Sequence, residues 1–272
     1  MKKIVKFLGF FVLIAFVFSC SKIDEVNYST DNEHIKFVSM NGSIVHQYLY
    51  DITGKIVEEN CLYYFKRYLY DENDRLVKVE SAFDESILSS STLVKRRTEF
   101  MTSQNSAVKS YSLYEYNNAG RLAKINNYAN MTGKEFELSS TQTFEYEGSN
   151  ITKVNLHDLT GQITQYRIYT YDNSGNITNE KYYSNLFGST NELLSETSYK
   201  YDNYENPFKI FSKLGSPGML SNVNNIIESS LIRHNEVPGF DKYSTSKTTY
   251  KYNSNGYPIK AIYGDSVEEY SY

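Results

Sequence analysis

Two pairs of adjacent acidic residues, Glu58-Glu59 and Glu268-Glu269, are the side chains of this 272-residue sequence that come closest to a catalytic arrangement. Two carboxyl groups roughly 5–9 Å apart could act as acid and base, or acid and nucleophile, on a glycosidic bond. Both pairs lie in stretches with the composition of β-strands, where neighbouring side chains point to opposite faces. Neither pair can therefore act on its own without a third residue from elsewhere in the chain.

The other chemistry-bearing residues form no recognisable catalytic or metal-binding pattern. No two of the four histidines (His34, His46, His157 and His234) stand at metal-ligand spacing, and we interpret them as surface or strand residues. The stretch 172–176, "DNSGN", is like the start of a calcium loop but lacks the later bidentate glutamate, and turn formation accounts for it. There is no nucleophile elbow and no phosphate-binding loop. We therefore predict no catalytic residue, no metal and no cofactor.

One short motif points to a covalent modification. Asp265-Ser266-Val267 resembles the Asp-Ser/Thr-aliphatic site at which envelope proteins of Bacteroidota are O-glycosylated. The resemblance implies a glycan on Ser266. A three-residue motif also arises by chance, so an ordinary strand residue is the alternative.

The N-terminal segment has the order of an export signal. Three lysines precede the 12-residue apolar run Phe7–Phe18, which is short for a membrane span and typical of a signal peptide. The run ends in Ser19-Cys20, which resembles a bacterial lipobox. The resemblance implies cleavage after Ser19 and acylation of Cys20, and two or three acyl chains, at about 0.8 kcal/mol per buried CH₂, anchor a protein stably. Ordinary signal-peptidase cleavage with an incidental cysteine is the alternative.

Residues 20–33 are polar without periodicity, and we predict a flexible tether between the lipidated Cys20 and the folded domain. Removal of residues 1–19 takes away three lysines and no acid, so the net charge changes from −4 to −7. A negative charge disfavours nucleic acid as a partner. Once Cys20 is acylated, Cys61 has no cysteine to pair with, and its apolar surroundings predict a buried thiol.

A repeated motif dominates the rest of the chain: an aromatic residue, any residue, a tyrosine, then in most copies an Asp or Asn and a later Gly. The tyrosines at its third position are Tyr50, Tyr70, Tyr116, Tyr146, Tyr171, Tyr201 and Tyr252. In a strand the two aromatics share one face, the Asp or Asn starts a turn, and the Gly takes a positive φ. Each unit therefore predicts a β-hairpin, after whose turn the apolar–polar alternation resumes. Two gaps between units are about twice the others, as expected if a unit decayed or was stretched by an insertion.

Hairpins in series predict an all-β, antiparallel up-and-down meander of about 14–17 strands over residues 34–272, in a single domain. A sheet of more than about ten strands rarely stays open and flat, so we expect a barrel or half-barrel, with a sandwich as a further option. The 27 tyrosines would fill its inside. A stacking platform for sugars is a less favoured role for them.

The stretch 212–243 lacks alternation and contains two of the four prolines. We predict an irregular insertion there, with a short helix over Asn222–Ile232. Such a long loop is often functional, but a plug over one end of the barrel is the favoured interpretation.

Two families share features with these residues. "YDNSGNIT" (171–178) and "YNNAGRLAKI" (116–125) resemble the YD repeats of Rhs-type proteins, which build β-shells, although the spacing here is irregular. The order "YDNYENPFKIF" (201–211), "SNVNNI" (221–226), "YKYNSNGYPIKA" (250–261) is more similar to lipoproteins of Bacteroidota with a porin-like β fold and no assigned function. That resemblance implies an architecture and an envelope location, and it carries no catalytic residues.

A barrel embedded in the outer membrane is disfavoured by the sequence. Strands such as "KRYLYDENDRLVKVE" (66–80) place charge on both faces, which costs about 2–4 kcal/mol per charge at the bilayer midplane. We therefore expect a non-enzymatic lipoprotein of the outer membrane, anchored through Cys20 on the periplasmic face or at the cell surface. It would bind a glycan, a peptide or an envelope protein. The alternatives are a glycan hydrolase or its accessory, and an adhesion subunit that pairs through sheet edges.

Overall fold

The computed structural model describes residues 34–84, 99–130, 133, 135–185, 191–215, 217–218, 221–235 and 239–272, and within them the chain forms strands and one 3-10 helix. The first nine strands are β1 (Phe37–Met40), β2 (Ser43–Tyr50), β3 (Ile56–Cys61), β4 (Tyr64–Tyr70), β5 (Leu76–Phe83), β6 (Ser110–Tyr116), β7 (Leu122–Ala129), β8 (Glu137–Glu147) and β9 (Asn150–His157). The others are β10 (Ile163–Tyr171), β11 (Ile177–Ser184), β12 (Glu192–Glu205), β13 (Asn224–Arg233), β14 (Tyr243–Lys247), β15 (Thr249–Tyr252), β16 (Pro258–Tyr263) and β17 (Ser266–Ser271). The helix is η2 (Pro207–Leu214).

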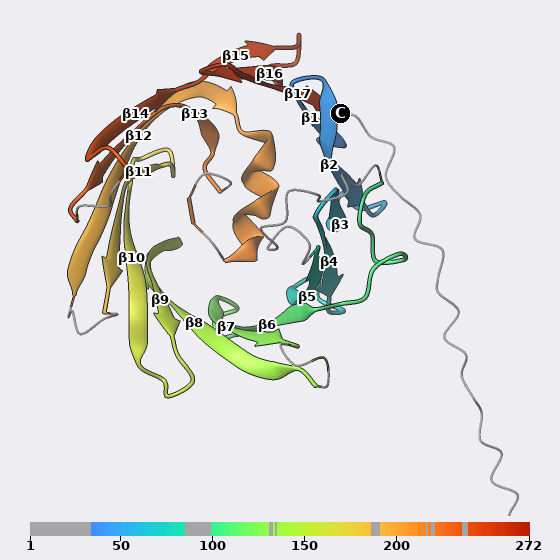
Figure 1. Cartoon of the computed structure of the whole chain (residues 1–272), viewed down its shortest axis with the longest axis vertical. Helices are drawn as coiled ribbons and strands as arrows, with labels where there is room; N and C mark the ends of the chain where they lie inside the picture. The colour runs from blue at the N-terminus through green and yellow to red at the C-terminus, as the bar shows by residue number, and fades with distance from the viewer. Residues whose placement is uncertain are drawn as a thin grey trace, which may run out of the picture.

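The described strands form one 17-stranded antiparallel sheet that curls into a nearly closed barrel (Figure 1). Each strand pairs with its neighbours in the sequence, and β17 pairs with β1 to close the ring. The exception is the seam, where β14 pairs with β13 and β15 with β16. These two strands are consecutive halves of one extended run, separated by Thr248. The predicted all-β up-and-down meander, curled into a barrel, is confirmed.

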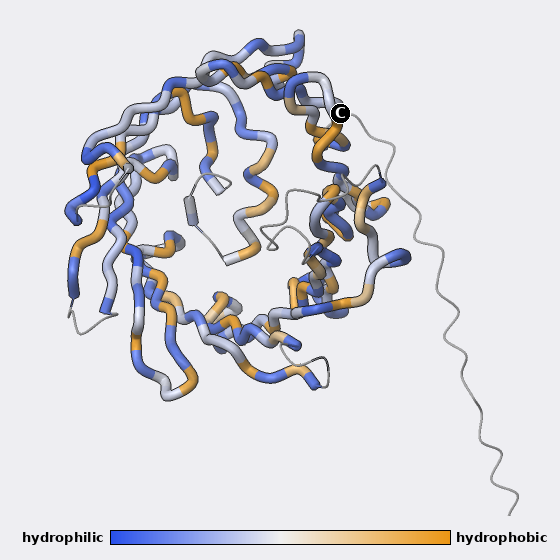
Figure 2. Tube along the Cα trace, viewed as in Figure 1, coloured by the Kyte–Doolittle hydropathy of each residue, from blue (hydrophilic) through white to orange (hydrophobic). Residues whose placement is uncertain are grey.

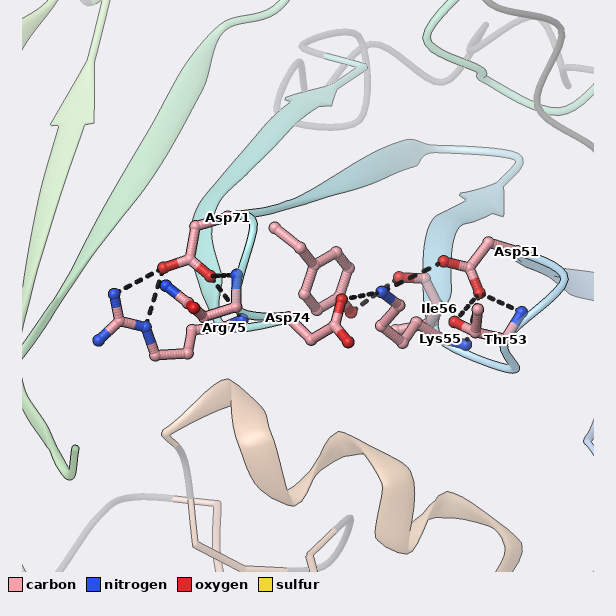
Figure 3. A network of polar contacts seen from close by, with 9 residues as sticks. Asp51, Thr53, Lys55, Ile56, Asp71, Asp74 and Arg75 are labelled. Atoms are coloured by element: carbon pink, nitrogen blue, oxygen red, sulfur yellow. Dashed lines mark hydrogen bonds and ion pairs between the residues drawn. The ribbon is translucent and has the colours of Figure 1, made fainter.

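The turns have the predicted chemistry. The Asp51 carboxylate accepts hydrogen bonds from the amides of Thr53 (2.8 Å) and Lys55 (3.0 Å), and Gly54 has a φ of 78° (Figure 3). The same contacts to the second and fourth following amides recur at Asp71, Asn117, Asp158, Asp172 and Asn253. Asp158 belongs to a further unit, which the tyrosine motif does not identify because His157 stands in place of the tyrosine before it.

The sequence predicted that apolar–polar alternation resumes directly after each turn. In the structure a β-bulge interrupts it. Leu49 pairs with Glu58 and Tyr50 with Ile56, so Val57 is an extra residue that forms a β-bulge. Register shifts recur at the matching tyrosine of the other units. The inward residues after a turn are consequently three positions apart, as at Leu76 and Val79, Leu122 and Ile125, and Pro258 and Ala261. Repeated bulges bend and twist a sheet, which favours closure into a barrel.

The repeated tyrosines connect each hairpin to the one before it. The hydroxyl of Tyr70 donates to the carbonyl of Ile56 at 2.8 Å, and that of Tyr171 donates to Ile151 at 2.7 Å. The same bond joins Tyr50 to Ile35, Tyr116 to Leu76, Tyr146 to Leu122, Tyr201 to Ile177 and Tyr272 to Pro258. The tyrosines thus bury their rings and satisfy their hydroxyls, as predicted from their composition.

The unit at Tyr201 departs from the pattern, because its turn is replaced by an inserted segment (residues 206–223). The helix η2 of this segment lies inside the ring of strands (Figure 1). The chain then returns to the wall as β13. The predicted helix over 222–232 is therefore wrong, since 224–233 is a strand, and the irregular insertion begins earlier than residue 212. Asn206 and Pro207 are ordinary signals for a helix start, so the helix begins there.

Buried asparagines hold the two ends of the inserted segment together. The side chain of Asn206 accepts from the amide of Phe208 (3.0 Å) and donates to the carbonyl of Asn222 (2.9 Å). Asn222, only 1% exposed, accepts from the amide of Ile177 on the barrel wall (2.8 Å). These bonds satisfy main-chain groups that have no partner in the sheet, so the segment is anchored to the wall.

The main hydrophobic core lies between η2 and the inner face of the wall. It joins Phe211 of the helix to Tyr48, Tyr68 and Tyr270 of the strands, together with Ile35 just before β1. Figure 2 shows apolar and polar residues interspersed along the strands, as expected for a sheet with two unlike faces.

Candidate binding site inside the barrel

A cavity of about 510 Å³ lies between η2 and the inner face of the barrel wall. Its aromatic lining comes from both sides: Phe208 and Phe211 from the helix, and Tyr48, Tyr250 and Tyr270 from the strands. The ring of Tyr48 meets those of Phe208 and Phe211 edge-on, at centroid distances of 6.2 and 5.6 Å. A mostly apolar cavity of this size, with a few converging polar groups, is typical of a small-molecule site.

The first polar cluster in the cavity is built around Glu59 of β3. Its carboxylate accepts hydrogen bonds from the hydroxyls of Tyr64 (2.6 Å) and Tyr68 (3.0 Å) and from the ammonium group of Lys66 (3.3 Å). The Nδ1 atom of His46 lies 3.7 Å from the same carboxylate. The charge of this nearly buried glutamate is therefore compensated within the cluster.

The second polar cluster is built around Glu268 of β17. Its two carboxylate oxygens accept one hydrogen bond each, from the hydroxyls of Tyr263 and Tyr270, both at 2.8 Å. No lysine, arginine or histidine in the described part of the chain forms an ion pair with this carboxylate. Glu268 therefore differs from Glu59, which has Lys66 beside it.

Burial and the two carboxylates shift the pKa values of the surrounding groups. Burial lowers the pKa of His46 from 6.5, and the charges of Glu59 and Glu268 oppose this shift only in part. Burial and the charge of Glu59 raise the pKa of Tyr64 well above 10.0. Burial, followed by the hydrogen bond to Glu268, raises the pKa of Tyr263 to about 12. At neutral pH the cavity therefore contains a neutral histidine and protonated tyrosines that donate hydrogen bonds.

The acidic pairs behave as the sequence predicted, since the two members of each pair point to opposite faces. Glu58 accepts from the amide of Ser103 (2.8 Å), and Glu269 pairs with Lys260 (2.9 Å), both away from the cavity. The structure also brings one member of each pair to a common site. Glu59 and Glu268, 209 positions apart in the sequence, line the same cavity.

A signal for Glu59 is present in the repeat itself. After each turn, two inward residues follow at a spacing of three. The second of them is apolar in most units, as Val79, Ile125 and Ala261 show. In two units it is a glutamate, Glu59 or Glu180. Glu180 forms an ion pair with Arg167 of the adjacent strand (3.0 Å), and this pair lies across the barrel from Glu59. The exception is visible only once the bulge, and hence the spacing of three, is known.

The cavity is open to solvent and has an arrangement suited to polar ligands. Lys66 and Ser246 line it, and the side chain of Lys66 is 41% exposed. Carboxylates accept hydrogen bonds from hydroxyl or amine groups, and aromatic faces cover the apolar C–H surfaces of a ring. Ser246 also lies next to the seam.

The other residues singled out in the sequence lie away from this cavity. Cys20 and the tether are outside the described residues. Ser266 begins β17 and pairs with Tyr263 in the hairpin between β16 and β17, where it is half-buried. Cys61 is 7% exposed, as predicted from its neighbours, and is a free thiol.

The histidines are dispersed. His34 contacts the ring of Tyr50, His157 bonds Thr143 (2.9 Å), and His234 lies 3.2 Å from Glu196. His46 is a residue of strand β2, which agrees with the interpretation of the histidines as surface or strand residues. It is the one histidine that lines the cavity, and this position was not predicted. Among the described residues, no group of three or more His, Cys, Asp or Glu side chains is placed to hold a metal ion. No helix in the same part of the chain is long and apolar enough to span a membrane.

The fold and the cavity together define an all-β, nearly closed barrel with an internal helix and an interior site. Solved structures with similarity to this chain include a porin-like protein from Bacteroides vulgatus, with 12% identity over 88% of this chain and 98% of that one and a TM-score of 0.49. Another is a porin-like protein from Bacteroides uniformis, with 11% identity, 89% and 97% coverage and a TM-score of 0.46. A third is the Tc holotoxin pore of Photorhabdus luminescens, with 17% identity over 81% of this chain and 12% of that one and a TM-score of 0.33. No family model and no curated protein matches the sequence.

Proposed function

We propose that this protein is a non-enzymatic lipoprotein of the outer membrane and that the cavity beside η2 binds a glycan. The observation that carries the proposal is the joint presence of aromatic walls and two carboxylates in a cavity of about 510 Å³ that solvent can reach. Sugars offer apolar C–H faces and many hydroxyl donors, and both features find complements here. The site lies inside the barrel beside η2, and Leu214 and Ser229 of the stretch 212–243 contribute to its lining.

The anchor follows from the N-terminal sequence. The apolar run before Ser19-Cys20 favours cleavage and acylation at Cys20, on the periplasmic face or at the cell surface. Charged side chains on the outer face of the barrel support the proposal that this face is in contact with water. Lys200, Glu228 and Lys247 lie side by side there on three adjacent strands, and the side chains of both lysines are at least 70% exposed.

The experiment is a thermal unfolding series on the protein purified in detergent, with a panel of glycans that includes peptidoglycan fragments. A glycan present at about 100 times its Kd adds roughly 2.7 kcal/mol to the free energy of unfolding. For a domain of this size the midpoint rises by on the order of 5–10 °C. A panel without any shift would contradict glycan binding.

A glycan hydrolase is the second candidate, because Glu59 and Glu268 face one cavity. Both carboxylates accept two tyrosine hydroxyl bonds, whereas a glycosidase needs one protonated carboxyl group as a proton donor. This geometry favours binding over hydrolysis. If the native protein released reducing sugar from a glycan and Glu59→Gln did not, hydrolysis would be favoured over binding.

Pairing through sheet edges is a third candidate, and the seam is the observation that favours it. At the seam β14 has a strand partner on one side only, and its Tyr243 is 64% exposed. Because the rest of the ring is closed, the described strands have unpaired edges only at the seam. A protein partner captured on β14, and lost when Thr245 is replaced by proline, would support this role.

A further inference from the structure

The two interior glutamates of the repeat units are both neutralised by a basic neighbour, whereas Glu268 is not. Glu59 has Lys66 at 3.3 Å, and Glu180 has Arg167 at 3.0 Å. Glu268 has only the hydroxyls of Tyr263 and Tyr270 within the described part of the chain. Hydroxyls solvate a carboxylate but do not cancel its charge.

The surroundings of Glu268 are aromatic. Tyr270 and Tyr250 line the cavity next to it. Burial raises the pKa of both tyrosines, and the charge of Glu268 adds to the shift, after that of Asp202 in the case of Tyr250. The ring of Phe208 lies 5.9 Å from that of Tyr270, edge to face. Aromatic faces attract a cation, so the rings and the carboxylate favour the same kind of ligand group.

The charges that face the cavity support the same conclusion. Glu59 and Lys66 cancel, and His46 is neutral near pH 7 because burial lowers its pKa. The remaining charge is that of Glu268. A neutral sugar would leave this carboxylate uncompensated when it displaced the water around it, and an acidic sugar would place a second negative charge beside it.

We propose that the cavity prefers an amino sugar, with its protonated primary amine bound by the Glu268 carboxylate and the rings of Tyr250 and Tyr270. This inference rests on the proposed function, because it names the class of glycan that the same cavity takes. A saccharide hydroxyl would then face the Glu59 cluster, where the carboxylate already has a cation.

The test compares three disaccharides that differ at one position of each ring. They are the disaccharide of glucosamine, the disaccharide of N-acetylglucosamine, and cellobiose. Cadaverine supplies an amine without a sugar. Affinities are measured by calorimetry on the full protein in detergent, on Glu268→Gln, and on Glu269→Gln. The last variant is a matched control, because Glu269 is the next residue, faces outward and pairs with Lys260 at 2.9 Å.

We expect the glucosamine disaccharide to bind 10- to 100-fold more tightly than the other two, as for one charge-assisted contact. Glu268→Gln should abolish this preference and Glu269→Gln should retain it. Equal affinity for the three sugars, or a preference that survives Glu268→Gln, would overturn the inference and leave glycan binding intact. If cadaverine binds and none of the three disaccharides does, the ammonium site is supported and the proposal that the ligand is a glycan is overturned. No binding of any probe would overturn both.

Discussion

At the scale of single residues, the tyrosine hydroxyls explain why the repeat keeps tyrosine where phenylalanine would fill the same space. Six of the seven repeat tyrosines, and Tyr272 in addition, each donate to a main-chain carbonyl of the neighbouring strand or of the residues beside it. Tyr252 is different, because the hairpin before it contains the inserted segment, and its hydroxyl bonds the carboxylate of Asp202 instead.

We predict that Tyr171→Phe lowers the free energy of unfolding by about 1 kcal/mol, because the carbonyl of Ile151 loses its 2.7 Å hydrogen bond while the ring stays buried. Urea unfolding followed by circular dichroism measures the change. Tyr243→Phe is the control, since Tyr243 is 64% exposed and should change the stability by less than about 0.5 kcal/mol. Equal effects of the two substitutions would contradict the role given to the hydroxyl.

His46 predicts a pH dependence of stability. Its folded pKa lies below the ordinary 6.5, chiefly because of burial, with Glu59 and Glu268 raising it and Lys66 lowering it. The unfolded chain therefore binds the proton more readily than the folded one. The contribution of His46 to stability is present above pH 6.5 and is lost as the pH falls from there through the folded pKa. His46→Gln should flatten this part of the pH profile of urea unfolding, and an unchanged slope would count against the assignment.

At the scale of elements, η2 is held in place at its C-terminal end by Gly215. This residue has a φ of 72°, and a Cβ atom there would come within 2.5 Å of Leu122 Cδ2 and 3.0 Å of Ile125 Cδ1. Gly120, in a surface turn, has nearly the same φ, 73°, but a Cβ atom there would meet no other atom within 4 Å. The two glycines therefore separate the cost of backbone strain from the cost of a clash.

We predict that Gly120→Ala costs about 1 kcal/mol, from the positive φ alone. Gly215→Ala should cost a further 1–3 kcal/mol, approximately the usual cost of overpacking, because the helix must move away from the wall. Equilibrium unfolding of both variants in urea measures the difference. Similar losses in the two variants would mean that η2 is not packed against β7 as described.

The elements were predictable from the sequence to the extent that their signals are local. An Asp or Asn followed by Gly at a fixed distance determines a turn through its own hydrogen bonds, so the hairpins were predicted well. The bulges were not, because the extra Val57 is defined only by pairing with the opposite strand. The helix lies earlier than expected, because Asn206 and Pro207 begin it. The residues of the expected helix instead pair with β12 and β14 as strand β13.

At the scale of the whole molecule, closure of the ring creates the site. Pairing of β17 with β1 brings Glu268 to the cavity that Glu59 lines from β3. No local pattern could predict this pair, because it depends on the number of strands and on which of them meet at closure. The same limit applied to His46, whose neighbours in the sequence are ordinary strand residues.

The buried tyrosines predict that the barrel unfolds cooperatively in alkali. Burial raises their pKa values above the ordinary 10.0, to about 12 for Tyr171, Tyr199 and Tyr263. A raised folded pKa gives stability that is complete below pH 10 and is lost as the pH rises through the folded value. The tyrosinate absorbance of these buried residues should therefore appear together with the loss of the β-sheet circular dichroism signal. Full ionisation near pH 10 with the sheet intact would contradict the burial.

The central claim is that the cavity beside η2 binds a glycan, and one pair of substitutions tests it most directly. Ser229 lines the cavity, and Ser230, the next residue of β13, faces the other side of the sheet and contacts Thr245. We predict that Ser229→Trp places an indole ring in the cavity and weakens binding of the glucosamine disaccharide at least tenfold in calorimetry, whereas Ser230→Trp binds like the unaltered protein. Undiminished binding by Ser229→Trp would show that the cavity is not the site.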